Sequence, residues 1–303
     1  MFIARLPSAL LALAVVGQLA ACANTGASGG SGTVTDTTVS ETAGTDATAG
    51  TDNGIAAADN GIAPVDVGNT SGEEKTIPQI HAASKSNCDE KKIIDTLKGV
   101  TIKSVIVTSP IDKTTTSKGK KLAGVYVQQK GGGADSGIYV STDQGGPLDG
   151  LKMGDVITII GNVAEFYCFT QVSPTVVTPE GTDLPTPTTV EIGKIGDKAT
   201  AAENHSWEGA LVTLNNVVVS DIAALGSDGK PHGDIYIGSS DSDSALLVSS
   251  SFGFFLTTKN ADGSFTSKWP KGTKFASITG VLQYGFTKYS LLPLGDKSIV
   301  VAK

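Results

Sequence analysis

Short apolar runs separated by glycines and polar turns dominate the chain after about residue 99. Their lengths and their apolar–polar alternation are typical of β-strands. In the first half of this region the runs cover 99–108, 123–129, 137–142, 155–164 and 168–177. In the second half they cover 209–220, 233–237, 245–249, 274–283 and 287–292. The pattern therefore predicts two successive sets of five strands.

Two passages repeat the same residue types in the same order. Residues 154–172 read as an apolar strand, a glycine, a polar step and then Tyr-Cys-Phe-Thr-Gln, and residues 275–288 read the same way up to Tyr-Gly-Phe-Thr-Lys. Shared residues in shared order are the mark of a repeated domain. Five short strands with glycine-marked bends fit a small, partly open barrel of the OB type. We expect a mainly β fold with two tandem five-stranded OB-like barrels.

The copies also differ outside their strands. Residues 86–99 carry acidic residues early, an apolar i, i+3, i+4 face and a final glycine, which predicts a short helix, and 198–204 predicts a second one. The second copy has an insertion at 252–271 that the first copy lacks. The insertion gives the second barrel a different surface.

The N-terminus resembles a bacterial lipoprotein signal peptide. Arg5 precedes an apolar stretch at 6–16, and Leu-Ala-Ala leads into Cys22. The resemblance implies cleavage before Cys22, acylation of that cysteine, export, and attachment to a membrane through the lipid. Ala23 favours, by the same resemblance, the outer membrane of the cell envelope. The alternative is an ordinary secretory signal with an incidental cysteine, and it also implies export.

Composition then sets the domain boundaries. Residues 22–76 are rich in Gly, Thr, Ala and Asp and contain no aromatic residue, so they cannot bury enough apolar surface to fold. We expect a disordered tether there. The organisation expected is a signal peptide at 1–21, the tether at 22–76, a first barrel at 77–172, a Pro- and Thr-rich connector at 173–195, and a second barrel at 196–303.

Charge limits the range of partners. The chain has a formal net charge of −7, but residues 75–303 hold 22 lysines and 22 acidic residues and are formally neutral. Arg5 is the only arginine. Because Arg is the preferred residue for bidentate phosphate and base contacts, strong general DNA binding is disfavoured. A local basic patch stays open.

Cys88 and Cys168 remain once Cys22 is assigned to lipid. Two cysteines in an exported domain are most simply a disulfide. Closing a loop of roughly 80 residues would contribute about 4 kcal/mol in the chain-entropy view. Free or metal-bound thiols are the alternative.

The order of motifs resembles a known family. Gly124-Val-Tyr-Val-Gln, the 154–161 turn and strand, 166–171, 207–212 and 280–284 look like the tandem OB-like region of secreted bacterial endonucleases of the ExeM and YhcR type. The resemblance covers roughly 99–303. In those enzymes a separate metal-dependent phosphodiesterase domain follows, whereas this sequence ends at Lys303. The resemblance thus implies the accessory binding region without the nuclease.

No catalytic constellation is recognisable in the sequence. His81, His205 and His232 are far apart and belong to no catalytic or zinc-binding motif, so we interpret them as solvated loop histidines. The Asp-Gly turns and the Asp241/Asp243 pair complete no calcium-binding loop. We expect neither an enzyme nor a metal or other cofactor.

A binding site is more readily predicted. OB barrels contact ligands through strands two and three and through the loops between strands one and two and strands four and five. Cations mixed with stacking rings are typical of single-strand binding. In the first copy these elements would present Lys113, Lys118, Lys120, Lys121, Tyr126, Lys130, Tyr139 and Tyr167. The alternative is that the lysine-rich loop is simply a solvated surface without a ligand. The tyrosines would then cap the barrel ends or pack on the second barrel.

The sequence therefore predicts a non-catalytic binding module that is anchored by lipid to the cell envelope. Single-stranded nucleic acid is the leading ligand, bound through the first barrel. A structural surface lipoprotein that binds protein or glycan is one alternative. An accessory subunit of a separate extracellular nuclease is another.

Overall fold

The computed structural model describes residues 72–84, 92–115, 119–166, 168–226, 229–285 and 287–303. All of them belong to one compact unit, Asn69–Lys303. The expected signal peptide, Cys22, most of the expected tether, Cys88, Lys118 and Tyr167 lie outside the described residues. Among the described residues, no helix has the length and apolar character needed to span a bilayer.

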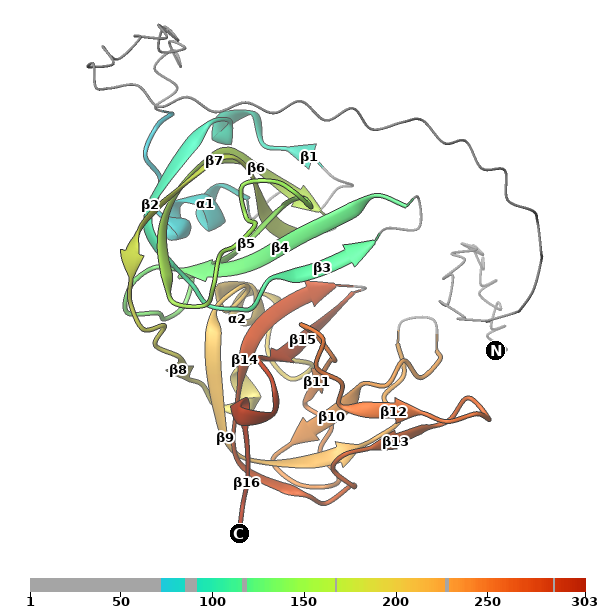
Figure 1. Cartoon of the computed structure of the whole chain (residues 1–303). Coiled ribbons are helices and arrows are strands. Elements are labelled where there is room, and N and C mark those ends of the chain that lie inside the picture. Colours follow the sequence, from blue (N-terminus) through green and yellow to red (C-terminus); the bar gives the residue numbers. More distant parts are fainter. Residues whose placement is uncertain (1–71, 85–91, 116–118, 167, 227–228, 286) are drawn as a thin grey trace, which may run out of the picture. The chain divides into compact units, whose positions relative to one another are not determined.

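The first barrel is a ring of five strands (Figure 1). They are β2 (Val100–Val107), β4 (Lys121–Gln128), β5 (Gly137–Asp143), β6 (Asp155–Phe166) and β7 (Phe169–Thr182). Strand β2 pairs with β4, β4 with β5, β5 in parallel with β7, β7 with β6, and β6 with β2 again, which closes the ring. Around it lie α1 (Ile77–Ser84), β1 (Lys92–Ile93), a 3-10 turn at Asp95–Leu97, and β3 (Asp112–Thr115).

The second barrel repeats this connectivity. Its strands are β9 (Leu211–Asp221), β10 (Ile235–Gly238), β11 (Leu246–Val248), β14 (Lys274–Gly285) and β15 (Lys288–Pro293). They pair in the order β9–β10–β11–β15–β14–β9, again with a parallel step, β11 to β15. The remaining elements are β8 (Thr188–Thr189), 3-10 turns at Ile192–Lys194 and Asp296–Ser298, α2 (Ala201–Ser206), β12 (Thr257–Lys259), β13 (Phe265–Ser267) and β16 (Ile299–Val301). The mainly β, OB-type fold predicted from the sequence is confirmed.

Strand alternation decides what fills each barrel. Val125 and Val127 of β4 point into the first core together with Ile138 and Val140 of β5. Ile235 and Ile237 of β10 do the same in the second core. Successive strand side chains point to opposite faces, so the residues between these positions must face outward. In the first barrel those outward residues include Tyr126 and Tyr139.

The helix expected at 86–99 is wrong in its described part. Lys92 and Ile93 pair with Glu165 and Ala164 as a short strand, and a 3-10 turn follows. The helix of this region lies earlier, at α1, where Ile77, Ile80, His81 and Ser84 are buried. These four positions follow i, i+3, i+4, i+7 spacing, which is the mark of an amphipathic helix. The other expected helix is present as α2, closed at its start by a Thr200–Glu203 capping box.

The expected connector also differs from the structure. Strand β7 continues to Thr182, which pairs with Asp155, so a boundary at residue 172 falls inside a strand. Pro174 and Pro179 lie beside the two register shifts of the β6–β7 pair. Bulges are where a strand tolerates proline. The prolines that suggested a linker are therefore accommodated within the barrel.

The two barrels meet along a seam formed by β5 and the turn that enters β9. A Cβ on Gly137 would lie 2.1 Å from the carbonyl carbon of Gly209, so only glycine permits this backbone approach. The buried side chain of Gln128 forms two hydrogen bonds at the seam. It accepts from Leu211 N at 3.2 Å and donates to Thr186 O at 3.0 Å. Asp135 N donates to Ser206 O at 2.5 Å. Backbone contacts thus fix the docking of the barrels.

We predict that Gly137→Ala destabilises the unit by about 1–3 kcal/mol, because the new methyl group must displace backbone in a packed seam. Urea unfolding of residues 69–303 measures the change. Gly193→Ala is the matched control, since nothing lies within 4 Å of the added carbon, and it should stay within about 0.5 kcal/mol of the parent. Equal effects of the two substitutions would contradict the seam geometry.

Candidate nucleic-acid interface

Two of the expected lysines share one face of the β3–β4 hairpin. Thr115 lies opposite Lys121, and Lys113 lies opposite Ala123, two residues along the same strand. Side chains at opposite and diagonal positions of an antiparallel pair project from the same face. Lys113 and Lys121 are exposed, and within the described part of the chain neither forms an ion pair. This face is the part of the expected site that the structure does assemble.

The other described lysines of the expected site form ion pairs, and one of them lies far from Lys113 and Lys121. Lys120 Nζ lies 2.8 Å from Asp143 Oδ1, which offsets its charge. Lys130 lies beyond the opposite end of β4, nine residues from Lys121, or about 30 Å along an extended strand. It pairs with Asp183 at 2.8 Å. The expected lysines therefore do not form one continuous patch.

Tyr126 is not a surface stacking platform. It is 1 % exposed, and it packs with Phe169 of the first barrel and with Leu211, Val281 and Leu292 of the second. Its ring centroid lies 4.8 Å from that of Tyr139. Of the readings left open by the sequence, packing on the second barrel is correct for Tyr126. Strands two and three of the first barrel face the seam and are covered there.

Burial also settles the chemistry of these rings. Desolvation, followed by the nearby Tyr139 and Asp112, raises the pKa of Tyr126 well above its usual value of 10. Desolvation likewise raises the pKa of Tyr139, with a smaller contribution from Asp112. Both phenols stay neutral, so neither can act as a base.

The second barrel carries an equivalent tyrosine in another setting. Tyr236 occupies in β10 the place of Tyr126 in β4, but its hydroxyl donates to Asp197 at 3.2 Å and accepts from Lys288 Nζ at 2.7 Å. The same Nζ lies 5.3 Å from the centre of the ring. Lys288 is not among the binding residues expected from the sequence. The repeat could have pointed to it, because Phe-Thr-Lys in the second copy replaces Phe-Thr-Gln in the first.

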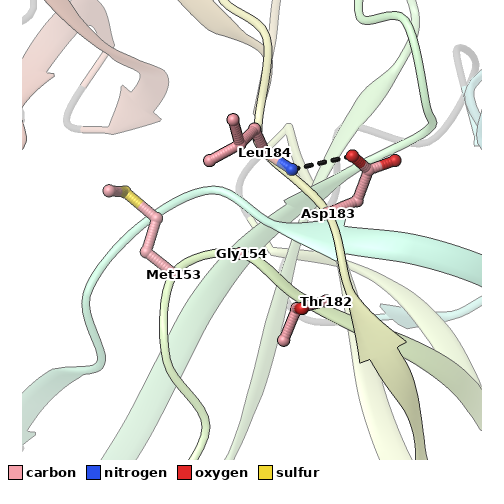
Figure 2. A pocket seen from close by; sticks show the side chains of 5 residues that line it. All are labelled: Met153, Gly154, Thr182, Asp183 and Leu184. Atoms are coloured by element: carbon pink, nitrogen blue, oxygen red, sulfur yellow. Dashed lines mark hydrogen bonds between the residues drawn. The ribbon is translucent and has the colours of Figure 1, made fainter.

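A shallow pocket of about 360 Å³ lies at one end of the first barrel (Figure 2). Its lining residues are Met153, Gly154, Thr182, Asp183 and Leu184. Met153 and Leu184 are exposed, and the polar groups lining the pocket are those of Thr182 and Asp183. Asp183 already holds Lys130 and the backbone N–H of Leu184.

The histidines are not all solvated, which corrects our interpretation. His81 is fully buried in α1, and its ring meets that of His205 edge-on at a centroid distance of 5.4 Å. His232 is exposed. Among the described residues, no three His, Cys, Asp or Glu side chains are placed to hold a metal ion.

The disulfide stays a prediction. Cys168 lies in the turn between β6 and β7 with φ of 67°. Its expected partner Cys88 is outside the described residues. The pairing is therefore untested by the geometry.

Comparison with known proteins gives structural likeness only. No family model and no curated protein matches the chain. The second OB-fold domain of replication protein A from Methanococcus maripaludis is 16% identical, with 29% of this chain and 89% of that chain covered and a TM-score of 0.22. The single-stranded DNA binding protein from Thermus aquaticus is 12% identical, with 66% and 90% covered and a TM-score of 0.19. At such TM-scores the likeness carries no argument about what this chain binds.

We predict that Tyr126→Phe leaves the stability of the unit unchanged or raises it. The Tyr126 hydroxyl is buried and has no hydrogen-bond partner among the described residues, and removing such a group relieves a desolvation cost. Tyr126→Ala should instead cost about 3–5 kcal/mol through the cavity it leaves. Urea unfolding measures both. A loss above about 1 kcal/mol for the Phe variant would show that the hydroxyl has a partner.

Proposed function

We propose that this chain is a non-catalytic binding module of the cell envelope that contacts single-stranded nucleic acid through the β3–β4 hairpin. The observation that carries the proposal is the pair Lys113 and Lys121 on one exposed face of that hairpin. Two ammonium groups without a carboxylate partner among the described residues suit a phosphate backbone. The hairpin also occupies the position of the loop between strands one and two, which OB barrels use for ligands.

The proposed contact lies away from the aromatic face expected from the sequence. With Tyr126 buried in the seam, base stacking on strands two and three is not open to a ligand in this arrangement. Binding then depends on charge more than on stacking. Such binding is weak, tolerant of sequence and strongly dependent on salt.

A protein partner is the second candidate, and it is favoured by one observation. Strand β3 pairs with β4 alone among the described strands, so its other edge carries unpaired backbone groups. An exposed edge can accept a further strand from a partner. Lysine on an edge strand is also a common protection against such pairing. Salt separates the two candidates, because backbone pairing does not release counterions.

We predict that residues 69–303 bind a fluorescent single-stranded oligonucleotide and that the logarithm of affinity falls linearly with the logarithm of salt concentration. Each phosphate contact contributes about 0.7 to that slope for single strands. The Lys113→Ala, Lys121→Ala double variant should therefore reduce the slope by about 1.4. Fluorescence anisotropy at several salt concentrations measures it.

Lys130→Ala serves as the control, because Lys130 is already paired with Asp183 at the far end of β4. It should leave the slope unchanged. Absence of binding at low salt, or an unchanged slope in the double variant, would remove nucleic acid as the ligand. Oligonucleotide binding that does not change with salt would exclude phosphate contacts by these two lysines.

The envelope part of the proposal rests on the N-terminal sequence alone. We propose that the chain is exported and anchored by a lipid on Cys22, in the outer membrane where the cell has one. In the producing bacterium, a labelled fatty acid should enter the wild-type protein and not the Cys22→Ala variant. The variant should also shift from the membrane to the soluble fraction. Equal labelling of the two proteins would rule out acylation at Cys22.

A further inference from the structure

Five polar side chains meet where α1 touches both barrels. His81 comes from α1, Glu165 and Thr170 come from β6 and β7, and His205 and Glu208 come from α2 and the turn after it. We call this group the seam cluster. His81, Glu165, Thr170 and Glu208 are each at most 2 % exposed. Buried ionisable groups are costly, so their arrangement here matters for the docking of the barrels.

Thr170 connects the two buried carboxylates. Its backbone N–H donates to Glu208 Oε1 at 2.9 Å, and its hydroxyl donates to Glu165 Oε1 at 2.6 Å. Ser84 Oγ of α1 lies 3.1 Å from the same hydroxyl. The first of these bonds crosses the seam, because Glu208 belongs to the segment that enters the second barrel. Charged acceptors make such bonds stronger than neutral ones.

Burial favours the neutral form of His81, and one hydrogen bond fixes which ring nitrogen carries the proton. Its Nε2 donates to Gly137 O at 2.8 Å, so this nitrogen carries the proton of the neutral ring. Nδ1 is buried and has no hydrogen-bond partner within the described part of the chain. A second proton would therefore create a buried donor, and a charge, at the point where Gly137 meets Gly209.

The charges around His81 are few and identifiable. Glu208, His205 and Asp135 face it, and Glu165 faces Glu208 and His205 from β6. Burial is the largest effect and lowers the pKa of His81, although Gly137 and the two acids act in the other direction. Burial raises the pKa of Glu165. His205 Nδ1 lies 3.7 Å from Glu208 Oε2.

We propose that the seam cluster is an acid-operated latch, in which protonation of His81 opens the seam between the barrels and releases α1. The closed arrangement binds this proton less well than the open one. A histidine whose pKa is lowered in the closed state stabilises that state above its ordinary pKa, and the stabilisation is lost as the pH falls. Glu165, whose pKa is raised in the closed state, acts with the opposite sign and stabilises that state as the pH falls. The window for the latch begins just below about pH 6.5, the ordinary pKa of a histidine.

Amide hydrogen exchange on residues 69–303 tests the latch, because that compact unit contains both cores and the whole seam cluster. The reporters are the N–H groups of Thr170 and Leu211, which bond across the seam. With an open-state pKa of about 6.5 and one proton, their protection should fall about tenfold between pH 7.5 and 5.5 after correction for intrinsic rates. Amides inside the barrels, such as that of Val140, should keep their protection.

His81→Gln is the decisive variant, since its amide can still donate to Gly137 O but takes up no proton. Its seam amides should show equal protection at both pH values. His232→Gln is the matched control at an exposed histidine and should keep the tenfold fall. A titration of the His81 ring by NMR in the unaltered chain adds a readout that needs no variant, and its midpoint should lie below 6.5.

Three results would overturn the latch. The first is equal protection of the seam amides at both pH values in the unaltered chain. The second is a fall in His81→Gln as large as in the unaltered chain, which would assign the effect to another group. The third is a His81 ring that titrates at or above 6.5 while the seam stays closed.

Discussion

The contact between the backbones of Gly137 and Gly209 is the constraint on which the docking of the two barrels depends. A Cβ at Gly137 would overlap Gly209, and a Cβ at Gly209 would lie 2.7 Å from the Ile138 nitrogen. At this separation the side chain of Gln128 reaches the backbone of Leu211, and Glu208 reaches Thr170. A wider seam would break both bonds and leave buried polar groups unpaired, which is costly. The close approach of the two glycines therefore allows hydrogen bonds between residues that are far apart in sequence.

Duplication alone does not give both barrels the same surface. Tyr126 and Tyr236 occupy equivalent strand positions and both face outward, but only Tyr126 meets another barrel. Tyr236 is instead covered in part by Lys288, which replaces the glutamine of the first copy. A tandem pair is asymmetric because each copy can present only one face to the other. Equivalent residues then diverge according to whether their face is covered or free.

This asymmetry explains what the sequence could and could not predict. The ten strands of the two barrels follow from local alternation of apolar and polar residues, and the sequence predicted them. Alternation predicts only that the Tyr126 side chain points out of the core. It does not predict whether that side chain then contacts solvent or a second barrel. The prolines at 174 and 179 suggested a linker, because bulges within a strand leave no separate mark in one sequence.

The meeting of His81 with His205 was even less predictable. The two residues lie in different copies, and their contact depends on docking that no local pattern encodes.

The seam cluster and the β3–β4 hairpin are two separate features of the chain. Contacts made by Lys113 and Lys121 need no change in the seam, whereas the buried ring of Tyr126 becomes reachable only when the barrels part, and the half-buried ring of Tyr139 is then more exposed. A ligand that required those rings would bind more tightly wherever the seam is open, and by linkage it would itself favour opening. The charge-driven binding proposed for the hairpin would have no such coupling, so the two modes of contact would differ in how they respond to acid.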